Sequence, residues 1–201
     1  MGFSQRISFR QGQMIYLIRH GETAWSASGQ HTGRTELPLT AAGEDAARRL
    51  GGRLAGVTFT HAFTSPRGRA IDTWKLSGLK PASEIREDLA EWHYGDYEGL
   101  TSAQIKEQRP GWNVFADGCP NGESPADVSA RADRVIQWLR TFSGPIAICS
   151  HGHFGRALGA RWIGLPIVDA GRLLLSTASV SILDYEHGQQ DRPAILLWNE
   201  A

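Results

Sequence analysis

Two short apolar runs, at residues 14–18 and 145–150, stand out along an otherwise mixed chain. Each is shorter than an ordinary helix and has no regular polar face, which is typical of strands buried on both sides. Looser alternation of apolar and polar residues predicts further strands. They are expected at residues 57–64, 85–89, 180–185 and 194–198.

Between these runs, apolar residues recur at helical spacing. Thr40 predicts the N-cap of a helix that reaches Leu54, and Ser65 with Pro66 predicts the cap and first turn of another. Further helices are expected at residues 102–108, 126–141 and 154–162. Residues 112–125 are rich in Gly, Pro, Asp and Asn, which predicts a loop. Strands that alternate with helices predict an α/β fold, here a three-layer α/β/α sandwich with a mostly parallel central sheet.

Composition adds limits to this picture. A chain of 201 residues that is 41% hydrophobic suits a single domain over residues 1–201, with residues 1–13 as a flexible leader. The 21 basic and 21 acidic residues cancel, so we expect neither nucleic acid nor membrane as a partner. No apolar stretch is long enough to cross a bilayer and the start lacks a signal peptide, so we expect a cytoplasmic protein.

Reactive residues follow three of the predicted strands directly. The first strand ends at Arg19-His20-Gly21, the second at Thr64-Ser65-Pro66 and a third at Ser150-His151-Gly152. Ligands of such folds bind beyond the carboxyl ends of parallel strands, so these residues should meet at one rim. The segment from Glu91 to Gly95 follows the short strand and can reach the same rim.

The residues at this rim belong to a longer ordered pattern. Leu17 to Thr23 resembles the signature of the histidine phosphatase (phosphoglycerate-mutase-like) superfamily, and six more matching segments follow in the family's order. They are Thr32-Gly33, Leu37 to Thr40, Thr64 to Thr73, Glu91 with Tyr94-Gly95, Gly122 to Ser124, and Ser150 to His153. The resemblance spans most of residues 14–160.

The resemblance implies a metal-independent, cofactor-free phosphoryl transfer with five catalytic residues. His20 would be the nucleophile that forms a phosphohistidine, with its other ring nitrogen held by a backbone carbonyl. Arg19 and Arg69 would grip the phosphate oxygens, and His151 would add a third positive contact as an imidazolium. Glu91 would protonate the leaving oxygen and later accept a proton from water, so it should be partly buried.

Other positions follow from the same resemblance. Substrate contacts are expected at Gly21, Ser26, Thr32, Gly33, Ser65, Tyr94 and Gly152. Arg69 is chosen over Arg67 because the family's Arg-Ala-x-x-Thr pattern begins at residue 69. Trp112 and Phe115 are either an aromatic lid or packing under a long loop. The remaining histidines are expected to be structural or surface residues: His31, His61, His93, His153 and His187.

Only residues 100–121 separate the glutamate motif from Gly122. Mutases of the family carry a longer insertion with basic residues at this place. A phosphatase is therefore favoured, with a cofactor-dependent phosphoglycerate mutase as the alternative. Residues 25–33 and 91–99 are similar to the fungal sedoheptulose-1,7-bisphosphatase branch, which implies a sugar phosphate or bisphosphate as the small phosphorylated metabolite. A homo-oligomer is left open.

Two rival functions belong to other classes. A metal hydrolase would use His20, His151, His153 and Glu91 as ligands, although two arginines beside His20 would repel a cation. A non-catalytic module would bind a phosphorylated ligand without turning it over. Taken singly, each residue also has a structural explanation, such as a solvated helix position for Arg69, and only the ordered set favours catalysis.

Overall fold

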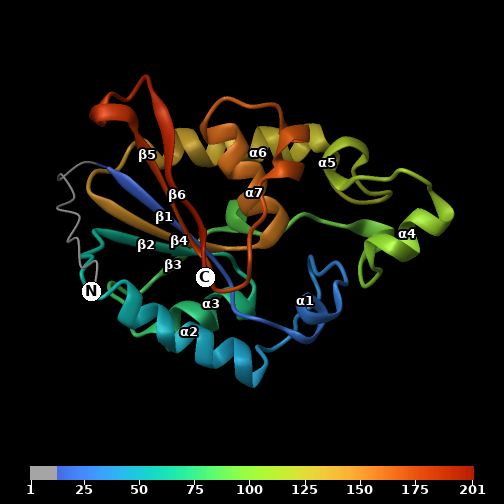
Figure 1. Cartoon of the computed structure of the whole chain (residues 1–201), viewed down its shortest axis with the longest axis horizontal. Helices are drawn as coiled ribbons and strands as arrows, with labels where there is room; N and C mark the ends of the chain where they lie inside the picture. The colour runs from blue at the N-terminus through green and yellow to red at the C-terminus, as the bar shows by residue number, and fades with distance from the viewer. Residues whose placement is uncertain (1–12) are drawn as a thin grey trace, which may run out of the picture.

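The computed structural model describes residues 13–201. Apart from Gln13, whose side-chain amide donates to the carbonyls of Leu139 and Phe142, the expected leader over residues 1–13 lies outside the described residues. A six-stranded sheet with the order β3-β2-β4-β1-β5-β6 forms the centre (Figure 1). Its strands are β1 (Met14–Arg19), β2 (His61–Thr64), β3 (Glu84–Ile85), β4 (Pro145–Ser150), β5 (Val180–Tyr185) and β6 (Pro193–Glu200).

Most neighbouring strands run parallel, as predicted. β1 pairs with β4, β4 with β2, and β2 with β3 in parallel register, whereas β5 is antiparallel to β1 and β6 is antiparallel to β5. The short connection between β5 and β6 allows only an antiparallel pair, because parallel neighbours need a long crossover. The carboxyl ends of β1, β2 and β4 therefore lie at one edge of the sheet.

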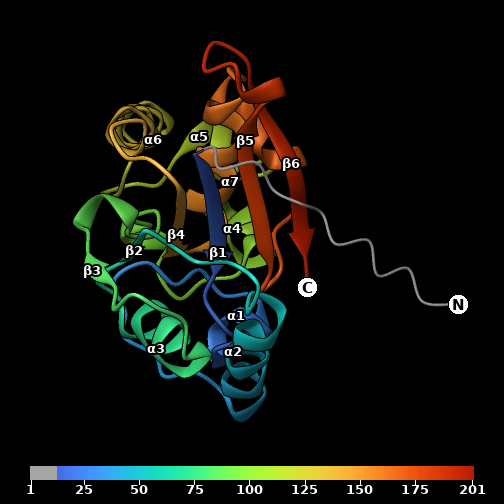
Figure 2. The same cartoon turned by 90° about the vertical axis from the view of Figure 1, so that its left-hand side faces the viewer.

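Helices cover both faces of the sheet, which confirms the three-layer sandwich (Figures 1 and 2). On one face lie α2 (Ala41–Arg53) and α3 (Gly68–Ser77), and on the other lie α6 (Pro125–Leu139) and α7 (Gly152–Trp162). The short helices are α1 (Ala24–Ser28), α4 (Ser102–Gln108) and α5 (Val114–Asp117). Short 3-10 helices occupy Glu87–Leu89, Gly95–Tyr97, Ile167–Arg172 and Glu186–Gly188. None of the helices within residues 13–201 is long and apolar enough to cross a bilayer.

The start predicted for the helix at Ser65 and Pro66, which is α3 in the structure, is wrong. α3 begins at Gly68, and Arg67 at its N-cap makes no capping bond with its side chain. The Ser65 hydroxyl that was expected to cap the helix instead lies 2.6 Å from His151 Nε2. The same hydroxyl keeps a local contact, because it accepts from the Arg67 N–H over 3.2 Å.

The segment predicted as loop over residues 112–125 contains the short helix α5. Asn113 caps this helix, since its side chain accepts from the Phe115 N–H. Trp112 and Phe115 are 3% and 2% exposed within the hydrophobic core, and Trp112 Nε1 donates to the Gly118 carbonyl. Burial of a large aromatic side chain stabilises the fold by about 1.5–3 kcal/mol, so packing, not a lid, is their role.

Candidate active site

The three strand ends meet as predicted. The His20 N–H donates to the Ser150 carbonyl over 3.0 Å, and the Ser65 N–H donates to the Cys149 carbonyl over 2.9 Å. The ring centroids of His20 and His151 are 5.1 Å apart. Parallel pairing of β1, β4 and β2 is what brings these residues, far apart in sequence, to one point.

His20 is held as a neutral imidazole with one free nitrogen. Its Nδ1 lies 2.7 Å from the Gly21 carbonyl oxygen. A carbonyl can only accept, so Nδ1 carries the proton and Nε2 keeps its lone pair. Burial lowers the pKa of His20 well below its usual 6.5, and the charges of Arg19 and Arg69 lower it further. Nε2 therefore has a free lone pair at neutral pH without any deprotonation, as a nucleophile would need.

The backbone after His20 is fixed by close glycine contacts. The Gly21 N–H donates to Thr73 Oγ1 over 2.8 Å. A Cβ atom on Gly21 would lie 2.6 Å from the Gly43 carbonyl oxygen, a separation that side chains essentially never adopt. Glycine at position 21 thus lets the loop that carries His20 lie directly against the first turn of α2.

Three buried nitrogen atoms near His20 lack a hydrogen-bond partner within residues 13–201. Arg19 donates from Nη1 to the Leu175 carbonyl, and Arg69 donates to three carbonyls of the loop at residues 32–35. The atoms without a partner are Nε of both arginines and Nδ1 of His151. Unpaired buried polar atoms are costly, and two of the three belong to cations, so this cluster beside His20 is suited to bind an anion.

The charge expected on His151 is wrong for this structure. Burial lowers the pKa of His151 well below 6.5, and the positive charges of Arg69 and Arg19 lower it further. The Ser65 hydroxyl accepts from the Arg67 N–H and also lies 2.6 Å from His151 Nε2. The lowered pKa favours a neutral His151 ring, not an imidazolium.

Glu91 lies against the N-terminus of α7 and is 9% exposed, which agrees with the expected burial. Its carboxylate accepts the N–H groups of Trp92, His153 and Phe154 at 2.9, 3.0 and 2.8 Å. These three N–H groups fix the position of the Glu91 carboxyl group at the edge of the pocket.

A buried ion pair positions the segment that carries Glu91. Arg131 forms a bidentate pair with Glu123 at 2.8 and 2.9 Å, and its third nitrogen donates to the carbonyls of Asp88 and Ala90. The same Glu123 carboxylate accepts the His93 N–H. The Gly122-Glu123-Ser124 motif thus holds the backbone on both sides of Glu91 in place.

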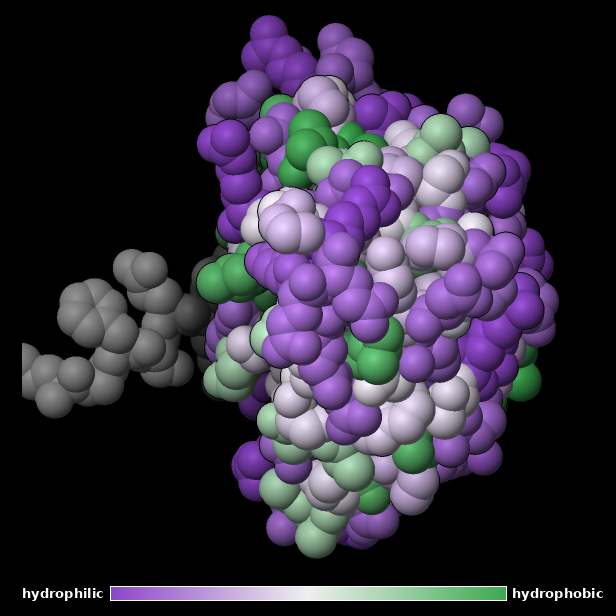
Figure 3. Space-filling view, turned by 90° about the vertical axis from the view of Figure 1, so that its right-hand side faces the viewer, coloured by the Kyte–Doolittle hydropathy of each residue, from purple (hydrophilic) through white to green (hydrophobic). Residues whose placement is uncertain are grey.

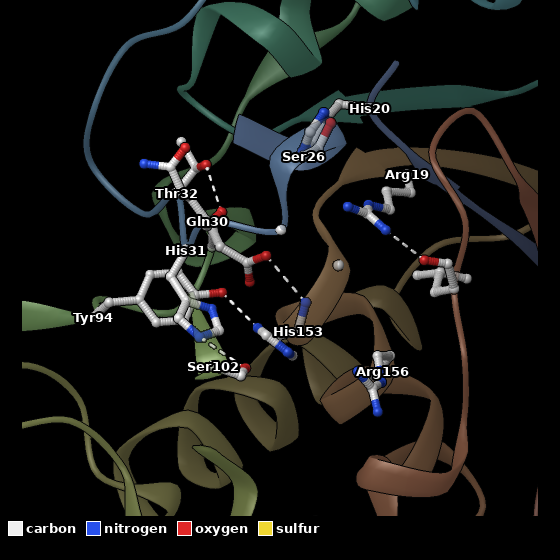
Figure 4. Close-up of a pocket in the computed structure, with 14 residues that line it drawn as sticks. Arg19, His20, Ser26, Gln30, His31, Thr32, Tyr94, Ser102, His153 and Arg156 are labelled. Carbon is white, nitrogen blue, oxygen red and sulfur yellow. Dashed lines mark hydrogen bonds between the residues drawn. The ribbon is translucent and has the colours of Figure 1, made fainter. Parts of the chain in front are cut away.

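A pocket of about 250 Å³ opens beside these residues (Figure 4). Seven of the twelve expected site residues line it: Arg19, His20, Ser26, Thr32, Glu91, Tyr94 and Gly152. The other five do not: Gly21, Gly33, Ser65, Arg69 and His151. Ser65, Arg69 and His151 are 0% exposed and lie beneath the lining, whereas Gly33 lines a neighbouring cavity.

The pocket also contains residues that the sequence analysis missed. They are Gly29, Gln30, His31, Ser102, His153, Arg156 and Leu175. The expectation that His31 and His153 are structural or surface residues is wrong in this respect. One signal was present in the sequence, because His153 and Arg156 are three apart on α7 and must share a helix face.

Within residues 13–201, no group of three or more His, Cys, Asp or Glu side chains is arranged to bind a metal ion. The metal-hydrolase alternative needs His20 and His151 as ligands. The charges of Arg19 and Arg69 are close enough to lower the pKa of both rings. Such positive charge opposes cation binding. A cheap check is activity in the presence of EDTA.

Stability is expected to fall in acid because of the buried histidines. Burial lowers the pKa of His31 from 6.5 to about 4, and His20, His151 and His153 shift in the same direction. The unfolded chain binds these protons near pH 6.5 and the native state does not, so the stabilisation is complete above that pH and is lost towards pH 4. For His31 alone, the loss is about 3 kcal/mol.

Urea unfolding at pH 7 and pH 4 measures this effect. In His31→Phe the fall in the free energy of unfolding should be smaller than in the wild type by about 3 kcal/mol. The matched control is His187→Phe, because His187 is exposed and should leave the pH dependence unchanged. Equal pH dependence in wild type and His31→Phe would contradict the assignment of a buried, neutral His31.

Known proteins resemble this chain over most of its length. Residues 15–201 match the family model of the histidine phosphatase superfamily, branch 1. The acid phosphatase of Mycobacterium tuberculosis is 46% identical over 179 residues, 87% of either chain. Sedoheptulose 1,7-bisphosphatase of Saccharomyces cerevisiae is 32% identical over 247 residues, 90% of either chain.

A solved structure agrees in fold. The structure of an open reading frame from Mycobacterium tuberculosis superposes with a TM-score of 0.89 and 41% sequence identity. The match covers 94% of this chain and 98% of that one. The similarity therefore extends to the whole arrangement of layers, including the edge at which the strand ends meet.

Proposed function

The chain belongs to the histidine phosphatase superfamily and is a phosphatase of small phosphorylated metabolites, and we propose that it works through a phosphohistidine on His20. The observation that carries this proposal is the neutral imidazole with a free Nε2 beside the unpaired buried nitrogen atoms of Arg19, Arg69 and His151. A nucleophile and an anion site in contact are what phosphoryl transfer requires.

In the first step, His20 Nε2 forms a bond to phosphorus while the bond from phosphorus to the leaving oxygen breaks. Glu91, as the carboxylic acid, gives its proton to that oxygen. In the second step, the Glu91 carboxylate takes a proton from water, the water oxygen attacks phosphorus, and the bond to Nε2 breaks. Inorganic phosphate leaves the pocket and His20 becomes neutral again. The Nδ1–H group of His20 donates to the Gly21 carbonyl throughout.

The bound phosphate also changes the charges around it. Its negative charge opposes the effect of Arg19 and Arg69 on His151, so we propose that His151 takes up a proton together with the substrate. This proton uptake adds a positive charge beside the phosphate before the first step.

We further propose a sugar phosphate or bisphosphate as substrate. Arg156 supports a second anionic group, because it lines the same pocket as Arg19 and is held by bonds from Nε and Nη2 to the carbonyls of Ala170 and Gly171. Phe115 packs beneath its guanidinium, 4.7 Å from ring centroid to Cζ. The test is phosphate release from a panel of sugar phosphates and bisphosphates, with and without EDTA.

Phosphatase activity on sugar phosphates is expected to exceed phosphoglycerate mutase activity. A mutase must retain its phosphorylated intermediate and keep water out until the second transfer. Of residues 100–121, only Ser102 lines the pocket, and Arg109 is paired with Asp117 at 2.8 Å. This interval thus supplies no cation to hold a second phosphorylated acid.

The deciding measurement is a parallel assay primed with 2,3-bisphosphoglycerate. Phosphate release from at least one sugar phosphate should be faster than interconversion of 2- and 3-phosphoglycerate. Faster interconversion than any hydrolysis would refute this assignment and favour the mutase.

A further inference from the structure

One wall of the pocket consists of uncharged groups that both donate and accept hydrogen bonds. We call it the imidazole wall, and its members are His31, Tyr94, Ser102 and His153. In Figure 4 these side chains lie together, across the pocket from His20 and Ser26. None of them takes part in the phosphoryl transfer described above.

The wall is held together by contacts among its own members. His31 stacks on Tyr94 with ring centroids 4.8 Å apart, and its Nε2 lies 3.3 Å from Ser102 Oγ. His153 Nδ1 lies 2.6 Å from the Tyr94 hydroxyl. Each imidazole thus uses one nitrogen inside the protein. The other nitrogens, His31 Nδ1 and His153 Nε2, have no hydrogen-bond partner among the described residues and remain available to a ligand.

Both imidazoles are neutral at pH 7. Burial lowers the pKa of His31 to about 4, and burial together with the positive charge of neighbouring groups lowers that of His153 well below 6.5. A hydroxyl group matches such a surface, because it too donates and accepts. A carboxylate or phosphate gains more from a cation, and the cations that line this pocket, Arg19 and Arg156, lie outside the wall.

Backbone pairing makes the wall rigid. The His31 N–H donates to the Leu100 carbonyl, and the Gly99 N–H donates to the His31 carbonyl, each over 2.9 Å. Ser102 is the first residue of α4, which begins directly after this pairing. The side of the molecule that carries α4 is mostly hydrophilic or neutral, with strongly hydrophobic residues only in small groups (Figure 3). These features suit a polar leaving group.

We propose that His31, Ser102 and His153 bind the hydroxyl groups of a polyhydroxylated leaving group. The enzyme thereby selects sugar and polyol phosphates over phosphate esters of plain alcohols. This inference rests on the proposed phosphatase function and names the part of the site that recognises the substrate class.

The test compares sorbitol 6-phosphate with hexyl phosphate, because both are esters of primary alcohols with the same carbon chain and differ only in hydroxyl groups. The wild type should have the higher kcat/KM for sorbitol 6-phosphate. Loss of one neutral hydrogen bond corresponds to about a two- to tenfold change. His31→Phe, Ser102→Ala and His153→Phe should each lower the ratio of the two kcat/KM values by about that factor, mainly through KM.

The double variant His31→Phe/Ser102→Ala gives an independent readout. His31 and Ser102 share a hydrogen bond, so the loss in the double variant should be smaller than the product of the two single losses. His61→Phe is the matched control. His61 starts β2, at the end of the strand away from the pocket, and its replacement should leave the ratio unchanged.

Thermal melting establishes that each variant is folded, and Ser102→Ala keeps the test decisive if His31→Phe does not fold. An unchanged ratio in every folded variant, or a wild type that prefers hexyl phosphate, would overturn the hydroxyl-binding role. If the wild type hydrolyses neither ester nor p-nitrophenyl phosphate, the phosphatase function itself is overturned.

Discussion

Replacing His20 by alanine is expected to lower turnover by at least about 10⁴-fold, because the other neutral imidazoles that line the pocket, His31 and His153, lie across it from His20. The fold should survive. Within the part of the chain that the structure describes, the only side-chain hydrogen bond of His20 goes to the neighbouring Gly21 carbonyl, while the backbone is held by β4 and by Thr73. The melting temperature should therefore change little.

Labelled substrate followed by rapid denaturation tests the intermediate directly. The wild type should retain label that is stable in alkali and labile in acid, as expected of phosphohistidine, and His20→Ala should retain none. His61→Ala, at the opposite end of the sheet, serves as the control and should keep the label. Label on a serine or cysteine, or undiminished turnover in His20→Ala, would rule out His20 as the nucleophile.

Replacing Glu91 by glutamine is expected to lower turnover by about 10²–10⁴-fold with little change in substrate binding, because proton transfer is lost. The glutamine carbonyl can still accept the N–H groups of Trp92 and Phe154, so two of the three backbone donors to this side chain keep their acceptor. The defect should shrink for p-nitrophenyl phosphate, whose leaving group departs without protonation.

Pre-steady-state kinetics should first establish that hydrolysis of the phosphoenzyme does not limit both rates. Glu107→Gln on the exposed side of α4 is the matched control and should leave turnover unchanged. An equal defect for good and poor leaving groups would show that Glu91 positions other groups without transferring a proton.

The parts of the fold that sequence patterns predicted well are those governed by local rules. β1 and β4 coincide with the two continuous apolar runs, because strands buried on both faces admit few polar residues. α2 begins after Thr40, whose side chain accepts from the Gly43 N–H as a capping residue should. The strand ends then placed His20, Ser65 and His151 together through parallel pairing alone.

The parts that could not be predicted depend on contacts between distant segments. The local sequence predicts that Ser65 caps a helix. Its hydroxyl also forms a hydrogen bond with His151, which is 86 residues away. The charge of His151 depends on how deeply the ring and its arginine neighbours are buried, which no spacing reveals. His31 and His153 face each other only because the loop after α1 pairs with the segment before α4.

The pairing of residue 31 with residues 99–100 has a consequence for how such an enzyme can be altered. The groups assigned to phosphoryl transfer lie at strand ends, on α3 and on the loop that carries Glu91. His31 and Ser102 lie instead on two other segments, residues 25–33 and 99–108, which are joined to each other by backbone hydrogen bonds. In directed evolution, the two segments can therefore be replaced together as one unit. Exchange of residues 25–33 together with 99–108 between relatives should transfer substrate preference while the chemical step is retained, and exchange of either one alone should break their pairing.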